Sequence, residues 1–172
     1  MRLTFLVILC GFSSFGAYAS VEDIPTHYYS TAAQEGVPVK LLYAITLQET
    51  QTLTTKGRVI PWKYSLNHAG KGYVYKNKDD LKSHAEYLLR NGIKNFDIGI
   101  GQINYRWHHQ NFSSLDEMIN PQTNLRYAAK YLKVHYEKLN NWWLAAGAYH
   151  APSNPKKAKK YMNEVRKKWL NI

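Results

Sequence analysis

The sequence predicts a mainly helical single domain with one small β-hairpin. Its 172 residues, of which 45% are hydrophobic, are enough to bury one ordinary core. Apolar residues recur at helical spacing along most of the chain, and one aromatic stretch with glycines interrupts this pattern. With only 10 Gly and 6 Pro, the composition excludes disordered, collagenous and low-complexity proteins.

Residues 1–19 have the anatomy of a secretory signal peptide. Arg2 supplies a positive start, residues 3–12 form an apolar run, and Ala17-Tyr18-Ala19 has the small residues of a cleavage site. A helix that spans a bilayer needs about 20 apolar residues, so this run is too short to be one. We expect cleavage after Ala19, export to the periplasm, and a domain that covers residues 20–172.

Cys10 is the only cysteine of the chain, and it lies inside the predicted signal peptide. The exported domain can therefore hold neither a disulfide nor a zinc site built on cysteine. An alternative interpretation is a lipoprotein modified at Cys10. Leu9 argues against it, because a small residue is expected directly before a lipidated cysteine.

Four longer helices are predicted, and prolines or a glycine mark most of their ends. Pro38, Pro121 and Pro155 each suit a first helical turn, and Gly92 suits a C-terminal cap. A short apolar segment, Trp142–Tyr149, lies between the last two helices. The predicted helices are Val37–Thr50, Asp79–Asn91, Pro121–Leu139 and Pro155–Trp169.

The segment Pro61–Tyr75 resists a helical interpretation. It has two aromatic, β-favouring runs around a turn that contains Gly70 and Gly72. We therefore expect a β-hairpin in this segment.

Glu49 is the candidate for acid chemistry. It lies four residues after Ile45 and seven after Leu42, which places it on the apolar stripe near the C-terminal end of its helix. Desolvation and the negative end of the helix dipole both raise the pKa of a carboxyl group there. An acid that stays protonated near neutral pH is what general acid catalysis of glycosidic cleavage needs. The alternative is a glutamate that turns out to solvent from a frayed last turn.

Two further motifs place polar side chains beside small residues. In Asn95–Asn104, Gly99 and Gly101 let the backbone approach a ligand closely, and Gln102 follows them. In Ala145–Pro152, small residues permit close packing before Tyr149 and His150. Taken alone, the first motif is compatible with an ordinary tight loop and the second with a core tyrosine near a helix end.

In their order and spacing, these motifs resemble the lytic transglycosylases, which share a fold with goose-type lysozyme. The resemblance covers the chain from Ile24 to Trp169. It implies an α+β lysozyme-like fold and cleavage of the β-1,4 bond between N-acetylmuramic acid and N-acetylglucosamine in peptidoglycan. The products would carry 1,6-anhydromuramyl ends, and the reaction would use no cofactor and no metal.

The resemblance also implies a role for individual residues. Glu49 would be the catalytic acid and base, Gln102 would line the sugar cleft, and Tyr149 would orient the carboxyl group of Glu49. The segment Trp62–Tyr75 and the helix after it are similar to an insertion in a secretion-associated branch of the family. That similarity makes components of a secretion or conjugation machine candidate partners.

Two departures from the family pattern concern the substrate subsites. Gly101 stands where the family usually has a larger apolar residue, often Met. His150-Ala151-Pro152 replaces the family's Asn-Ala-Gly, so the usual contact of that Asn with substrate is lost or passes to His150. A ring nitrogen of His150 is able to donate the same hydrogen bond.

Two rival functions remain open. The first is a hydrolytic lysozyme, which would use a second carboxylate, and Asp97 is the acidic residue of a cleft-forming motif that could supply it. The pattern favours a structural role for Asp97 in a loop, because Asp before a Gly turn usually bonds local backbone amides. The second is a non-catalytic basic adaptor of a secretion system that binds the wall, which would have no need of an acid on a buried stripe.

The charge of the chain indicates an acidic partner. Lys and Arg total 23 against 12 acidic residues, a formal net charge of +11, and loss of Arg2 leaves +10. Peptidoglycan, whose stem peptides carry carboxylates, and an anionic membrane surface both fit. Export argues against nucleic acid, and the chain carries no nucleic-acid motif. The basic stretches Lys156–Lys160 and Arg166–Lys168 could hold the wall or could simply be a solvated helix face.

The histidines show no metal-ligand spacing. His108 and His109 are adjacent, so they point to different sides of any helix. We expect a monomer without a metal.

Overall fold

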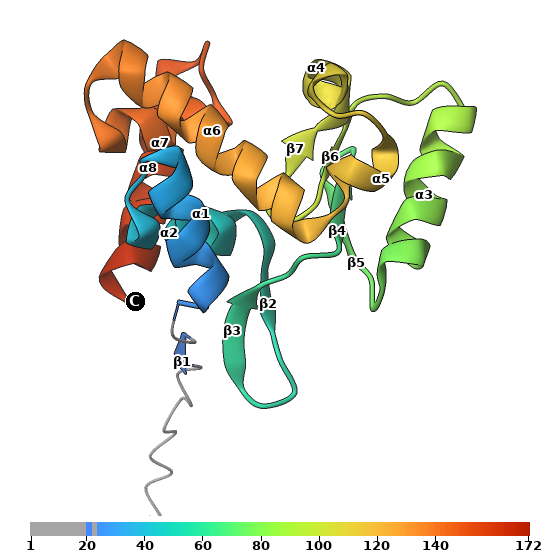
Figure 1. Ribbon diagram of the computed structural model, residues 1–172, viewed down its shortest axis with the longest axis horizontal. Coiled ribbons are helices and arrows are strands. Elements are labelled where there is room, and N and C mark those ends of the chain that lie inside the picture. The colour runs from blue at the N-terminus through green and yellow to red at the C-terminus, as the bar shows by residue number, and fades with distance from the viewer. Residues whose placement is uncertain (1–19, 22–23) are drawn as a thin grey trace, which may run out of the picture.

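The computed structural model shows two groups of elements joined by one long helix, α6 (Pro121–Leu139). Helices α1, α2, α7 and α8 gather at one end of α6, and strands β4–β7 with α3, α4 and α5 lie at the other (Figure 1). The structure describes residues 20–21 and 24–172. The predicted signal peptide, residues 1–19 with Cys10, lies outside the described residues.

Helices dominate the described chain, which confirms the mainly helical class. The helices are α1 (Thr26–Glu35), α2 (Val39–Thr50), α3 (Lys78–Arg90), α4 (Tyr105–His108), α5 (Leu115–Met118), α6, α7 (Trp142–His150) and α8 (Pro155–Leu170), with a 3₁₀ turn at His109–Asn111. The strands are β1 (Ser20–Val21), β2 (Gln51–Leu53), β3 (Arg58–Pro61), β4 (Ser65–His68), β5 (Lys71–Val74), β6 (Phe96–Ile98) and β7 (Ile103–Asn104).

All four predicted helices form, and capping side chains set where three of them begin. The side-chain oxygens of Asn77, Asn120 and Asn154 accept hydrogen bonds from backbone N–H groups in the first turns of α3, α6 and α8. Because Asn77 caps α3, this helix runs one residue earlier than predicted at both ends. The short helices α4 and α5, and also α1, were not predicted.

The predicted hairpin forms as β4 and β5, within a four-stranded sheet of order β5-β4-β6-β7. Its two-residue turn, Ala69-Gly70, has positive φ at both positions (52° and 78°), as tight antiparallel hairpins require. In the strand register of this sheet, Gly72 pairs with Asn67, Asn67 with Asp97, and Asp97 with Asn104. One face of the sheet therefore carries these four residues as a cross-strand row.

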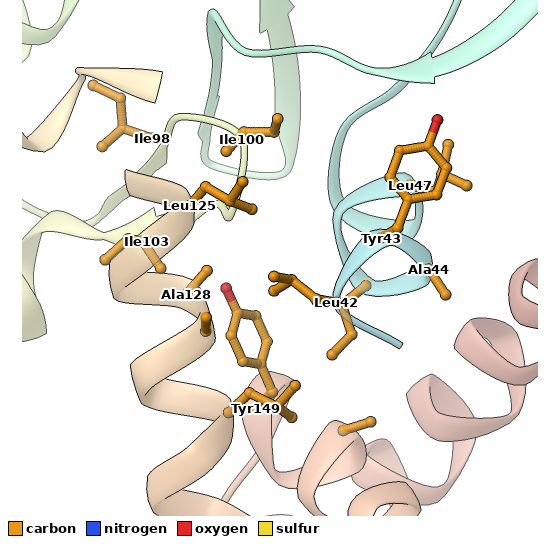
Figure 2. Packing of buried hydrophobic residues seen from close by; sticks show 14 of the residues in the cluster. Leu42, Tyr43, Ala44, Leu47, Ile98, Ile100, Ile103, Leu125, Ala128 and Tyr149 are labelled. Carbon is orange, nitrogen blue, oxygen red and sulfur yellow. The ribbon is translucent and has the colours of Figure 1, made fainter. Parts of the chain in front are cut away.

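The core surrounds α2, which is apolar on nearly every side. Residues Leu41–Leu47 of this helix are all buried, as expected for a helix enclosed by neighbours. Helix α2 packs against α8, and α7 packs against both α6 and α8. In Figure 2, Tyr149 of α7 lies between Ala128 of α6 and Leu42 of α2. This packing holds the C-terminal turn of α2 close to α7 and α8.

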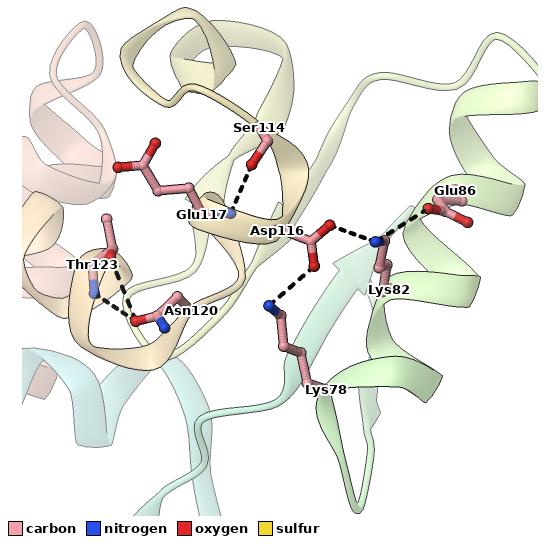
Figure 3. A network of polar contacts seen from close by, with 8 residues as sticks. All are labelled: Lys78, Lys82, Glu86, Ser114, Asp116, Glu117, Asn120 and Thr123. Carbon is pink, nitrogen blue, oxygen red and sulfur yellow. Dashed lines mark hydrogen bonds and ion pairs between the residues drawn. The ribbon is translucent and has the colours of Figure 1, made fainter.

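Ion pairs tie α3 to the helical turn before α6 (Figure 3). Asp116 of α5 accepts a hydrogen bond from Lys82 and pairs with Lys78 at 3.0 Å, both on α3. The apolar face of α3 contributes Leu81, Ala85 and Leu88 to the core. Among the described residues, no helix combines the length and the hydropathy that crossing a membrane requires.

Candidate active site

One cavity of about 760 Å³ brings together all five site residues that the sequence predicted. It lies between the four-stranded sheet and the ends of α2 and α7. The predicted residues on its wall are Glu49, Asp97, Gln102, Tyr149 and His150. Residues that the sequence analysis did not select also line it, namely Asn67, Ile103, Asn104, Trp107, His108, Tyr131, Pro152 and Ser153.

Glu49 lies in the last turn of α2, partly exposed to this cavity and otherwise enclosed by protein. Burial raises the pKa of Glu49 from 4.5 to about 7, the Tyr161 hydrogen bond opposes this rise, and the nearby charge of Asp97 adds to it. The carboxyl group therefore exchanges its proton near neutral pH. The alternative of a glutamate turned out to solvent does not fit this position.

Tyr161 of α8, and not Tyr149, holds the carboxyl group of Glu49. The Tyr161 hydroxyl donates a 2.5 Å hydrogen bond to Glu49 Oε1. The hydroxyl of Tyr149 instead donates to the carbonyl oxygen of Gly101 at 2.6 Å. Tyr149 was expected to orient this carboxyl group; in the structure its hydroxyl is engaged by Gly101, and the packing of α8 on α2 brings Tyr161 to the acid instead. The sequence signal was a tyrosine on a buried stripe, whose hydroxyl needs a partner.

His150 covers Tyr161 from the cavity side. Its ring stacks on the Tyr161 ring with centroids 4.6 Å apart and planes 3° from parallel. Burial lowers the pKa of His150, and the charge of Asp97 partly offsets this. The imidazole is thus neutral near neutral pH, so one ring nitrogen donates and the other accepts.

The loop that carries Gln102 is fixed by Asn124, a fully buried residue of α6. Asn124 Nδ2 donates to the carbonyl oxygens of Ile98 (3.0 Å) and Met118 (2.9 Å), and Asn124 Oδ1 accepts from the Gly101 N–H (2.8 Å). Gln102 itself has φ +46°, an uncommon conformation for a residue with a side chain. Its amide donates to the Gly99 carbonyl oxygen at 2.9 Å, which holds it at the cavity wall.

The two glycines of this loop are required by close packing against α6. A Cβ at Gly99 would lie 2.4 Å from Asn124 Nδ2, and φ is +80° there. A Cβ at Gly101 would lie 2.7 Å from the Cβ of Ala128 and 3.1 Å from the Tyr149 hydroxyl. The departure from the family pattern at Gly101 therefore has a physical cause, since the loop lies against α6 with no room for a side chain.

Asp97 lies on strand β6, not in a loop, and its partner is a side chain. Asn104 Nδ2 on β7 donates to Asp97 Oδ1 at 2.8 Å. Burial raises the pKa of Asp97, and the hydrogen bond from Asn104 and the neighbouring His150 oppose the rise. The expectation of bonds to local backbone amides was therefore wrong, because strand pairing engages the backbone and turns the carboxylate toward the cavity.

Trp107 of α4 is the most exposed large aromatic residue of the cavity, with 63% of its surface accessible. The guanidinium of Arg106 lies over its ring at 4.9 Å. An exposed indole beside polar amides suits the apolar face of a sugar ring. Within the described part of the chain, no three His, Cys, Asp or Glu residues cluster as metal ligands.

This fold and this cleft belong to a known class of protein. The chain belongs to the transglycosylase SLT domain family, whose model matches residues 76–172, more than half of the chain. It is also similar to Protein IpgF of Shigella flexneri and to Protein IpgF of Shigella sonnei. Each is 36% identical over 118 residues, which cover 64% of this chain and 76% of the relative. No solved structure matches the chain.

The family match includes Gln102, Tyr149, His150 and Tyr161, and it begins after Glu49 and after the hairpin β4–β5. The match to the family model confirms the resemblance to this family that the sequence motifs indicated. The roles of individual residues rest on the geometry of the cleft.

Proposed function

We propose that this protein is a peptidoglycan lytic transglycosylase in which Glu49 acts first as the acid and then as the base. The observation that carries the proposal is the carboxyl group of Glu49, partly desolvated, with its pKa raised to about 7 and held by Tyr161 at the wall of a 760 Å³ cleft. A group with that pKa is populated in both protonation states near neutral pH, as a single acid and base requires.

In the first step, protonated Glu49 donates its proton to the oxygen that links N-acetylmuramic acid to N-acetylglucosamine. The bond from C1 to that oxygen breaks, and the 2-acetamido group of the same muramic acid residue stabilises the positive charge at C1. A second carboxylate of the enzyme is not needed for this step. N-acetylglucosamine leaves with the proton from Glu49 on its oxygen.

In the second step, ionised Glu49 takes the proton from the C6 hydroxyl of the muramic acid, and that oxygen closes onto C1. The attack is intramolecular, with an effective molarity of about 10⁵–10⁸ M for well-oriented groups, so it outcompetes water. Glu49 regains its proton, and the enzyme is ready for the next bond. The product carries a 1,6-anhydro ring and is lighter by one water than a hydrolytic product.

The other cleft residues support this chemistry by position. The Tyr161 hydroxyl stabilises the ionised form of Glu49 by hydrogen bonding, which offsets part of the desolvation. Gln102 and His150 present an amide and a neutral imidazole to the sugar. Hydrolysis would instead need Asp97 as the second carboxylate, and Asn104 engages one oxygen of that group by hydrogen bonding.

We further propose that residues 1–19 direct the chain to the periplasm, where residues 20–172 act as a monomer on the wall. The net charge of +10 that remains after loss of Arg2 favours binding to the acidic stem peptides. The similarity of Trp62–Tyr75 to the insertion of a secretion-associated branch supports service to a secretion or conjugation machine. N-terminal sequencing of the periplasmic protein should begin at Ser20; an intact Met1 or a lipid on Cys10 would contradict export in this form.

Mass analysis of the products from purified peptidoglycan tests the reaction. We expect muropeptides with 1,6-anhydromuramyl ends. Reducing ends that disappear in an Asp97→Asn variant would instead identify a two-carboxylate lysozyme. A digest without products, together with wall binding, would identify the non-catalytic adaptor.

A further inference from the structure

A second cavity, of about 270 Å³, adjoins the cleft at the acid. Glu49, Asn67 and Gln102 line both cavities, so the carboxyl group lies at the junction of two hollows. The second cavity extends from this junction over the end of α2, strand β2 and the hairpin β4–β5. It lies on the opposite side of the acid from α4, since β5 and β7 form opposite edges of the sheet and α4 directly follows β7.

The sheet provides a continuous floor beneath both cavities. The cross-strand row Gly72, Asn67, Asp97 and Asn104 passes from the second cavity into the first. Neighbours in such a row are about 5 Å apart, so the row spans about 15 Å, which is longer than a single sugar ring. On this floor the amide of Asn67 can donate to and accept from sugar hydroxyl groups, and the carboxylate of Asp97 can accept from them.

Gly72 keeps the second cavity open. It lies opposite Asn67 on the cleft face of the hairpin, and a Cβ at this position would have nothing within 4 Å. Two residues along the strand, Val74 is 61% exposed on the same face, so the cavity opens to solvent over β5. At the other edge of the sheet, the exposed ring of Trp107 marks the opening of the first cavity.

From this juxtaposition we propose that the two cavities form one glycan groove with Glu49 in its middle, so that the enzyme cuts strands internally rather than from an end. The inference rests on the proposed function and adds the form of the substrate, a glycan strand bound on both sides of the scissile bond. The hairpin β4–β5 builds the second half of the groove, and it lies outside the segment that matches the family model.

The product distribution of the unmodified protein tests the groove without any variant. Long glycan strands freed of stem peptides are digested, and strand length and chain ends are followed by chromatography and mass spectrometry. Internal cutting should lower the mean strand length early and yield anhydro-ended oligomers of many lengths. Release of disaccharides alone from the first time point would overturn the groove but leave the proposed reaction standing. A digest without anhydro ends would refute the proposed reaction itself.

Filling the second cavity tests the role of the hairpin. Gly72→Phe projects a ring into open space, so we expect a folded protein whose kcat/KM on long strands falls about tenfold, the equivalent of about 1.4 kcal/mol. Lys71→Phe carries the same ring on the opposite face of β5 and should digest as the unmodified protein does. Equal activity of folded Gly72→Phe, checked by circular dichroism, would exclude this cavity from the groove.

Discussion

At the residue scale, the carboxyl group of Glu49 is subject to opposing influences. Desolvation raises its pKa, and the hydroxyl of Tyr161 lowers it by hydrogen bonding to the ionised form. The resulting pKa of about 7 makes the group a usable acid and a usable base at the same pH.

Glu49→Gln keeps the size and hydrogen-bond acceptor of the side chain but removes the proton that is transferred. We expect wall-clearing activity to fall by about 10²–10⁴-fold or more, since a positioned general acid contributes that much and this one also acts as base. The circular dichroism spectrum should not change. Glu164→Gln, at a partly exposed carboxylate of α8 that pairs with Lys167, is the matched control and should retain activity. Near-normal activity of Glu49→Gln would remove Glu49 from the mechanism.

Tyr161→Phe removes the donor that lowers the pKa of Glu49. The pKa of Glu49 should therefore rise, and the alkaline limb of the kcat/KM profile, near pH 7 in the unmodified protein, should move to higher pH. Loss of orientation should lower the rate by about 10–100-fold. Tyr149→Phe, which loses a bond to Gly101 and none to Glu49, should leave the position of the limb in place. If the alkaline limb stays at the same pH in Tyr161→Phe, Tyr161 does not set the pKa of Glu49 and serves only to pack the core.

At the element scale, the loop after β6 depends on its fit against α6. Gly101→Ala places a Cβ where Ala128 already lies 2.7 Å away, so we expect a loss of stability of about 1–3 kcal/mol. Ala128→Gly removes the opposing methyl group. In a double-mutant cycle of urea unfolding, the two changes should therefore be less destabilising together than the sum of their separate effects. Strict additivity would show that the loop moves freely away from the helix.

Helix α8 presents a basic surface apart from the residues that hold the acid. Lys156, Lys157, Lys159 and Lys160 are exposed, so their attraction to the acidic wall is screened over about 8 Å at physiological ionic strength. Replacing these four with Ser should weaken wall pull-down at low salt and leave the turnover of short soluble glycans unchanged. The control is a variant of the same net charge in which four exposed lysines elsewhere are replaced with Ser, namely Lys56, Lys76, Lys94 and Lys138. Equal pull-down by both variants would show that only net charge matters.

At the scale of the whole molecule, a partly buried acid reduces stability in a defined pH range. Between pH 4.5 and about 7, folded Glu49 keeps a proton that the unfolded chain has lost, so the free energy of unfolding falls as pH rises. With about 1.4 kcal/mol per pKa unit and partial exposure to the cleft, this amounts to about 1–3 kcal/mol. Glu49→Gln should therefore match the unmodified protein at pH 4 and exceed it in stability above pH 7. Parallel stability curves across this range would show that Glu49 titrates normally.

The sequence by itself determined the elements and most of the members of the site. Helical spacing, prolines in first turns and a Gly-rich aromatic segment predicted the four longer helices and the hairpin, because these signals act over a few neighbouring residues. The same local patterns singled out Glu49, Gln102 and His150, which the structure brings to one cleft. The short helices and β6, whose lengths are too small for a periodic pattern, were not predictable in this way.

Only the tertiary structure decided which side chains meet. Tyr161 lies 112 residues after Glu49, and its hydroxyl reaches the carboxyl group because α8 packs against α2. Asp97 faces Asn104 through strand register, and Gly72 keeps a cavity open because it pairs with Asn67 across the hairpin. Contacts of this kind depend on how apolar faces pack over long sequence separations. Local periodicity carries no record of that packing, and so the partner of the acid and the second half of the groove emerge only from the folded chain.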